Sequence, residues 1–143
     1  MQKHSTPGCG RSAKLLSKCA GTGPLGERLW PELQVDDGDL VVEKAAASAF
    51  FPGRCPLTGL LERRGIDTVL ITGTFTYVCC EFSARDASTL GYRVIMVVDA
   101  DDARRDEDHH ATVRTIHRTF GDVRPTADVL ALIHNHGPHG RRR

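Results

Sequence analysis

The chain has 143 residues, of which 40% are hydrophobic and 26% are charged, and these values are typical of a single globular domain with its own core. Its formal net charge of +1 at pH 7 does not favour a nucleic-acid partner, and no stretch is long and apolar enough to span a membrane. No secretory signal pattern is present, and the five cysteines include no Cys-x-x-Cys pair that would indicate a metal site. We therefore expect a reduced, cytoplasmic protein with no cofactor and no metal.

The first half of the chain begins with residues 1–38, which are rich in Gly, Pro, Ser and Thr and predict an irregular, loop-rich segment. Residues 39–44 (DLVVEK) then predict a short strand, and PLTGLLERRG predicts a helix that ends at Gly65. The β-branched apolar run Thr68–Thr74 lacks the alternation of a half-exposed strand. We therefore expect a buried strand of a parallel sheet there.

The second half of the chain continues this alternation. CCEFSARDASTLGY predicts a helix that ends at Gly91, and residues 93–100 predict a second buried strand. RDEDHHATVRTIHRTFG predicts a third helix ended by Gly121, with acids in its first turn and an apolar face at core spacing: Val113, Ile116 and Phe120. Thr126 is a candidate N-cap for a last helix, TADVLALI, and residues 134–143 are expected to form a disordered basic tail.

Strand, helix, strand and helix in succession are typical of α/β proteins whose parallel strands are joined by right-handed crossovers. Residues 39–133 are accordingly the predicted domain. Ligands of such sheets gather beyond the carboxyl ends of the strands. The segment TGTFTYVCCEFSARDA lies at one of these ends, so its side chains are candidates for a functional site.

Cys79 lies where the strand TVLITGT gives way to the next helix. A thiol at a helix N-terminus faces free N–H groups and a partial positive charge, which favour the thiolate and could hold an oxyanion. The alternative is an inert, small apolar side chain packed at a strand–helix corner. Cys80 points about 100° away around the helix, so we expect it to belong to the core.

A cysteine nucleophile needs a base and a group that stabilises charge. Lys44 ends the strand predicted at residues 39–44 and could reach the same crevice, although an ordinary exposed lysine fits its spacing equally well. The histidines are interpreted as solvated side chains of the third helix or of the tail: His109, His110, His117, His134, His136 and His139.

Residues 64–133 resemble the C-terminal half of the isochorismatase-like cysteine hydrolases, and VEKAAASAFFPG resembles the segment just upstream of it. The most specific motif is Gly-x-x-Thr-x-Val-Cys, followed by Glu and then by Ala-Arg-Asp-Ala. The resemblance covers residues 38–133. It implies an α/β, isochorismatase-like (Rossmann-like) three-layer fold with a parallel sheet, incomplete at the N-terminus.

The resemblance also implies roles for individual residues. Cys79 matches the nucleophile of the family, and Lys44 matches its catalytic lysine. A cis peptide is expected between Thr74 and Phe75, and the backbone N–H groups of Phe75 and Cys79 would form the oxyanion hole. Phe50 and Tyr77 are the expected walls of the substrate pocket.

The third catalytic residue of the family is an aspartate that acts as general base at the end of the first strand. Residues 1–38 contain no apolar run that ends in Asp, because Asp36 and Asp37 lie in a turn before LVV. The chain therefore resembles an N-terminally truncated member of the family. We expect its own hydrolytic activity to be weak or absent.

The resemblance implies a hydrolase that cleaves an amide, ureido or related C–N bond of a small molecule. The alternatives are a catalytically inactive, truncated paralogue that acts as an interaction module, and a gene fragment without a stable fold. Without its first strand the sheet would have an open edge, which favours a homo-oligomer or pairing with a relative. Neither nucleic acid nor membrane is expected as a partner.

Overall fold

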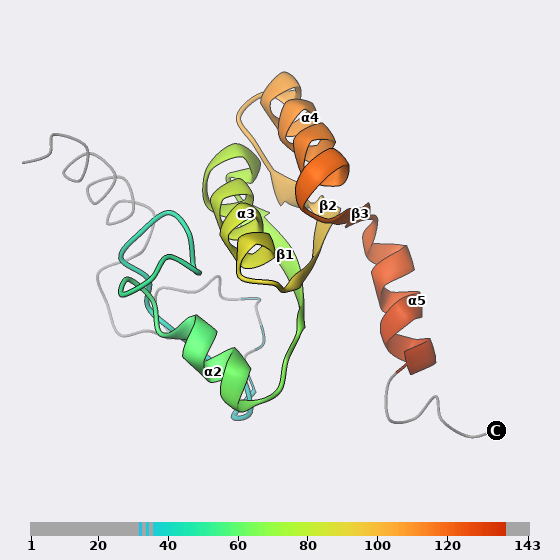
Figure 1. Ribbon diagram of the computed structural model, residues 1–143. Helices are drawn as coiled ribbons and strands as arrows, with labels where there is room; N and C mark the ends of the chain where they lie inside the picture. The colour runs from blue at the N-terminus through green and yellow to red at the C-terminus, as the bar shows by residue number, and fades with distance from the viewer. Residues whose placement is uncertain (1–31, 33, 35, 137–143) are drawn as a thin grey trace, which may run out of the picture.

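The computed structural model describes residues 32, 34 and 36–136 (Figure 1). Most of the segment predicted to be loop-rich, residues 1–38, lies outside this range. The described residues contain a three-stranded parallel sheet in the order β1-β2-β3, formed by β1 (Thr68–Thr74), β2 (Arg93–Asp102) and β3 (Asp122–Arg124). The predicted α/β class with a parallel sheet is confirmed.

Helices connect and flank these strands. They are α2 (Leu57–Arg63), the π-helical turn η2 (Thr76–Cys80) with α3 (Glu81–Thr89), α4 (Asp106–Thr115) with its π-helical continuation η3 (Ile116–Phe120), and α5 (Thr126–His136). The predicted ends of the first two helices are confirmed, because Gly65 and Gly91 adopt positive φ angles of 64° and 92°, which favour glycine. In Figure 1, α3 and α4 lie close together over the sheet, whereas α5 extends away from it.

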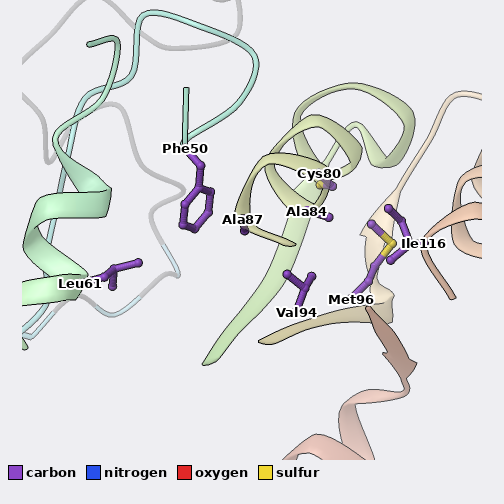
Figure 2. Packing of buried hydrophobic residues seen from close by; sticks show 8 residues of the cluster. All are labelled: Phe50, Leu61, Cys80, Ala84, Ala87, Val94, Met96 and Ile116. Carbon is purple, nitrogen blue, oxygen red and sulfur yellow. The ribbon is translucent and has the colours of Figure 1, made fainter. Parts of the chain in front are cut away.

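The core lies between α3, β2 and the end of the third helix (Figure 2). Small side chains of α3 allow the helix to approach the sheet closely, and larger side chains of β2 and η3 fill the space opposite. Phe50 and Leu61 extend this cluster toward α2. The other buried members are Cys80, Ala84, Ala87, Val94, Met96 and Ile116.

Strand β1 is more exposed than its sequence predicts. Among the described strands it pairs only with β2, and this pairing is irregular between Ile71 and Gly73. Leu70 is 43% exposed, and only Val69 and Ile71 are half-buried. The prediction of a buried strand is wrong for β1 and right for β2, because in the described part of the chain no element pairs with the second edge of β1.

The strand predicted at residues 39–44 is absent. Asp39 N–H donates to Asp36 O at 2.9 Å, and Asp36 N–H donates to Asp39 Oδ2 at 3.0 Å, so the segment starts from a turn. It continues as irregular chain because none of the described strands pairs with it. An apolar, β-branched run alone does not form a strand without a neighbour.

Two further differences lie at the C-terminal end of the sheet. Strand β3 has only three residues and was not predicted, because so short a run has no recognisable period. Thr126 is the first residue of α5 rather than its N-cap, and its hydroxyl donates to Asp99 Oδ1 at 2.7 Å. Helix α5 also continues through residues 134–136, which were predicted to belong to the tail.

Candidate active site

A cleft of about 880 Å³ runs along β1 and ends at the cysteine segment. It is lined by Lys44, Phe50, Cys79, Cys80 and all seven residues of β1. The structure therefore brings Lys44 and Cys79 to one cleft, although they come from distant parts of the sequence. Most of the remaining lining is apolar, from α2 and the loop before it.

Cys79 lies in the π-helical turn η2, which continues without a break into α3. Its thiol is half-buried and free. The peptide bond between Thr74 and Phe75, at the entrance to this turn, is cis. The Phe75 carbonyl accepts hydrogen bonds from the N–H groups of Val78 at 3.0 Å and Cys80 at 3.4 Å, which closes the first turn around Cys79.

Lys44 reaches the cleft from irregular chain rather than from a strand. Its Nζ donates to the carbonyl oxygens of Ala46 at 3.0 Å and Ala47 at 2.7 Å. The side chain is half-buried. Because two backbone carbonyls hold the ammonium group, Lys44 is a fixed charge of the cleft and not a freely moving surface lysine.

Phe50 and Tyr77, both expected to line the substrate pocket, have different surroundings. Phe50 lines the cleft and packs against Tyr92, with 5.5 Å between the ring centroids. Tyr77 is not part of the lining of this cleft. Its ring stacks on that of Phe75 at 5.9 Å and an interplanar angle of 24°.

Cys80 belongs to the core, as predicted, and is only 3% exposed. Burial raises the pKa of its thiol far above the ordinary range, and the negative charge of Asp101 raises it further. Of the two neighbouring cysteines, Cys80 is therefore the protonated, unreactive one. Cys79, by contrast, is a free and half-buried thiol that lines the cleft.

His109 is not solvated, contrary to the interpretation of its acidic helical turn. It is half-buried, and its Nδ1 lies 3.0 Å from the Oγ1 of Thr76 at the start of η2. Helix periodicity could not identify this contact, because it joins residues of two helices far apart in the sequence. The position of Thr76 in the cysteine motif was the only available signal.

Asp101 is a buried carboxyl that sequence reasoning did not identify. It lies opposite Gly73 in the pairing of β2 with β1, and it is only 8% exposed. Neither carboxyl oxygen has a hydrogen-bond partner of good geometry within the part of the chain that the structure describes. Burial raises its pKa from 3.8 to about 6, and the Cys80 thiol and the Gly73 backbone offset this rise only in part.

Because its pKa is raised in the folded state, Asp101 destabilises the fold progressively as pH rises through about 6. We expect Asp101→Asn to be more stable than wild type by about 1–3 kcal/mol at about pH 8, and equally stable at about pH 4. Urea unfolding at both pH values measures this difference. Asp99→Asn on the same strand is the control and should destabilise at about pH 8, because Thr126 lowers the Asp99 pKa. Equal gains from Asp101→Asn at both pH values would contradict the prediction.

Residues 36–136 contain neither a metal cluster nor a membrane-spanning helix. No three His, Cys, Asp or Glu side chains come together there in a way that could hold a metal ion. None of the helices in this range has both the length and the hydropathy needed to cross a membrane.

Most of this chain is similar in sequence to known proteins. Residues 3–128 match the model of the isochorismatase domain. The chain is 42% identical over 103 residues to an uncharacterized isochorismatase family protein of Bacillus subtilis, YwoC, covering 72% of this chain and 53% of that protein. It is 37% identical over 93 residues to maleamate amidohydrolase of Pseudomonas putida, covering 65% of this chain and 43% of that protein.

A solved structure agrees with these sequence matches. The crystal structure of N-carbamoylsarcosine amidase from Thermoplasma acidophilum has a TM-score of 0.66 and 30% identity, over 80% of this chain and 64% of that one. The chain spans about half the length of the curated relatives it matches. With most of its length matched by the domain model, this chain belongs to the isochorismatase family.

Proposed function

We propose that the chain is a cysteine hydrolase that cleaves an amide, ureido or related C–N bond of a small molecule, with Cys79 as its nucleophile. The observation that carries the proposal is that Cys79 and Lys44 line one cleft at the carboxyl end of β1. The named relatives support the bond class, since one is an amidohydrolase of maleamate and another an amidase of N-carbamoylsarcosine. The largely apolar lining of this cleft supports a small-molecule substrate, and we propose that the reaction takes place in the cytoplasm.

In the proposed reaction, the Cys79 thiol loses its proton to a base, and its sulfur attacks the carbonyl carbon of the substrate. The tetrahedral oxyanion accepts hydrogen bonds from the backbone N–H groups of Phe75 and Cys79. Its collapse breaks the C–N bond, and the nitrogen leaves with a proton as amine or ammonia. Water then hydrolyses the thioester, which releases the acid and restores the thiol.

Lys44 has an electrostatic role in this proposal. Its ammonium group is held by Ala46 and Ala47, and it favours the thiolate and the negatively charged intermediate. The general base is the missing part, because residues 1–38 contain no apolar run that ends in Asp. We therefore expect slow turnover from the chain alone, even with a reactive thiol.

Alkylation by iodoacetamide at about pH 7 tests the reactive thiol directly. We expect Cys79 to react about tenfold faster than Cys55, which is also a half-buried free thiol, because Cys79 lies in the first turn of a helix and shares its cleft with the Lys44 ammonium group. Cys80 should react slowest. Mass spectrometry of peptides gives the rate for each cysteine. If Cys79 reacts no faster than Cys55, the role of nucleophile is excluded.

The second candidate function is an interaction module without catalytic activity. The observation that favours it is the second edge of β1, which no strand of the described residues pairs with and where Leu70 is 43% exposed. This candidate predicts an unreactive Cys79, so the same alkylation experiment distinguishes the two functions.

A further inference from the structure

Helix α4 contacts the cysteine segment through two polar side-chain pairs. The Oγ1 of Thr76 and the Nδ1 of His109 share a hydrogen bond of 3.0 Å. Thr112 Oγ1 donates to Glu81 Oε2 at 2.9 Å. Thr76 precedes Cys79 by three residues and Glu81 follows it by two, so the two contacts bracket the candidate nucleophile.

These contacts are shielded from solvent. Thr76 is 0% exposed and Thr112 is 4% exposed. A hydroxyl buried to this degree costs about 1–3 kcal/mol when it loses its partner. Glu81 is held from a second side as well, because Arg85 Nε donates to its Oε1 at 2.9 Å. Neither contact can therefore be replaced easily by water.

The spacing of the contacts matches the π-helical turn. The Glu81 N–H donates to Thr76 O, an i→i+5 bond that places these two residues one above the other. In an ordinary α-helix, five residues span about 1.4 turns and would face different directions. His109 and Thr112 are three residues apart and share a face of α4. The two ends of one π-helical turn thus meet two neighbouring side chains of one helix.

We propose that His109 and Thr112 are positioning residues that hold the π-helical turn η2, and with it the Cys79 thiol, in the geometry required for attack. The proposal rests on the proposed role of Cys79. Neither residue touches the substrate cleft, so each acts only through the turn. Their loss allows the turn to relax toward ordinary α-helix, which rotates Cys79 away from the cleft.

The test measures the alkylation rate of Cys79 relative to Cys55 in matched variants. We expect His109→Ala and Thr76→Val to lower this ratio about tenfold, which corresponds to the loss of one buried hydrogen bond. His109→Asn should keep the alkylation ratio near the wild-type value, because the Asn amide can occupy the position of Nδ1. His109→Gln should lower the ratio as His109→Ala does, because the Gln amide reaches the position of Nε2 instead. His117→Ala, at an exposed histidine of η3, is the control and should match wild type.

A second readout keeps this proposal separate from the proposed function. Hydrogen exchange of the peptide covering residues 75–82 should be faster in His109→Ala and Thr76→Val than in wild type, and normal in His109→Asn. If Cys79 of the wild type is alkylated slowly, its role as nucleophile is excluded. The hydrogen-exchange result then decides by itself whether His109 and Thr112 hold the turn. The proposal is overturned if residues 75–82 exchange at the wild-type rate in His109→Ala. It is also overturned if exchange becomes faster uniformly over the whole chain while the alkylation ratio of Cys79 to Cys55 stays unchanged.

Discussion

A Cys79→Ala variant is expected to release no ammonia from small primary amides and N-carbamoyl compounds, whereas wild type releases it slowly over hours. Loss of a nucleophile removes the covalent pathway and typically costs several orders of magnitude in rate. We expect the wild-type rate to be slow because residues 1–38 contain no apolar run that ends in Asp, the pattern expected for the general base. The measurement is ammonia released at saturating substrate, compared with buffer alone.

Cys80→Ala is the matched control for this experiment. It removes a thiol one residue away that is buried in the core and protonated, so the release of ammonia should remain at the wild-type level. Thermal melting of both variants shows whether each is folded. Equal release by Cys79→Ala and wild type would exclude Cys79 as nucleophile. No release by folded wild type would favour the interaction module.

Gly121→Ala is expected to destabilise the fold by about 2–4 kcal/mol. A Cβ at this position would lie 2.5 Å from the carbonyl oxygen of Val94 and 2.9 Å from its Cβ. Val94 belongs to the central strand β2, whose backbone is held on both sides and cannot move aside. The backbone of Gly121 is extended, with φ of 179°, so close approach rather than left-handed conformation requires glycine here.

Gly59→Ala is the control for Gly121→Ala. Gly59 lies inside helix α2, where a Cβ would meet only the flexible end of Arg63 at 3.4 Å. We expect this variant to be more stable than wild type by about 0.5–1 kcal/mol, because alanine favours the helix. Urea unfolding measures both changes. A Gly121→Ala variant as stable as wild type would show that β2 and β3 can separate at no cost.

The predictable part of the fold consists of elements with a strong local signal. The helix around α3 ends at Gly91 as expected, and Ile116 is buried within the predicted apolar face of the third helix. The segment 39–44 and strand β1 show the limit of such signals. Both are apolar and β-branched, but strand formation and burial depend on a neighbour that local sequence does not specify.

The site was predictable where a motif specifies it. Cys79 and Lys44 line one cleft, and both were singled out from the sequence. His109 and Asp101 were not identified from the sequence, because their importance arises from contacts between segments far apart in the chain. A histidine in an acidic helical turn and an aspartate near a strand end are usually solvated. In this fold His109 contacts Thr76 and Asp101 lies opposite Gly73, and neither contact can be read from local sequence.

Among the described residues no strand pairs with the second edge of β1, and this edge determines where the sheet can grow. The carboxyl ends of parallel strands meet at one edge of a sheet, so a further strand added in parallel beside β1 would end next to Thr74. Its last side chain would enter the cleft that Lys44 and Cys79 already line. The edge of β1 is therefore the place where an added strand would supply a further side chain to the cleft without disturbing the pairing of β1 with β2.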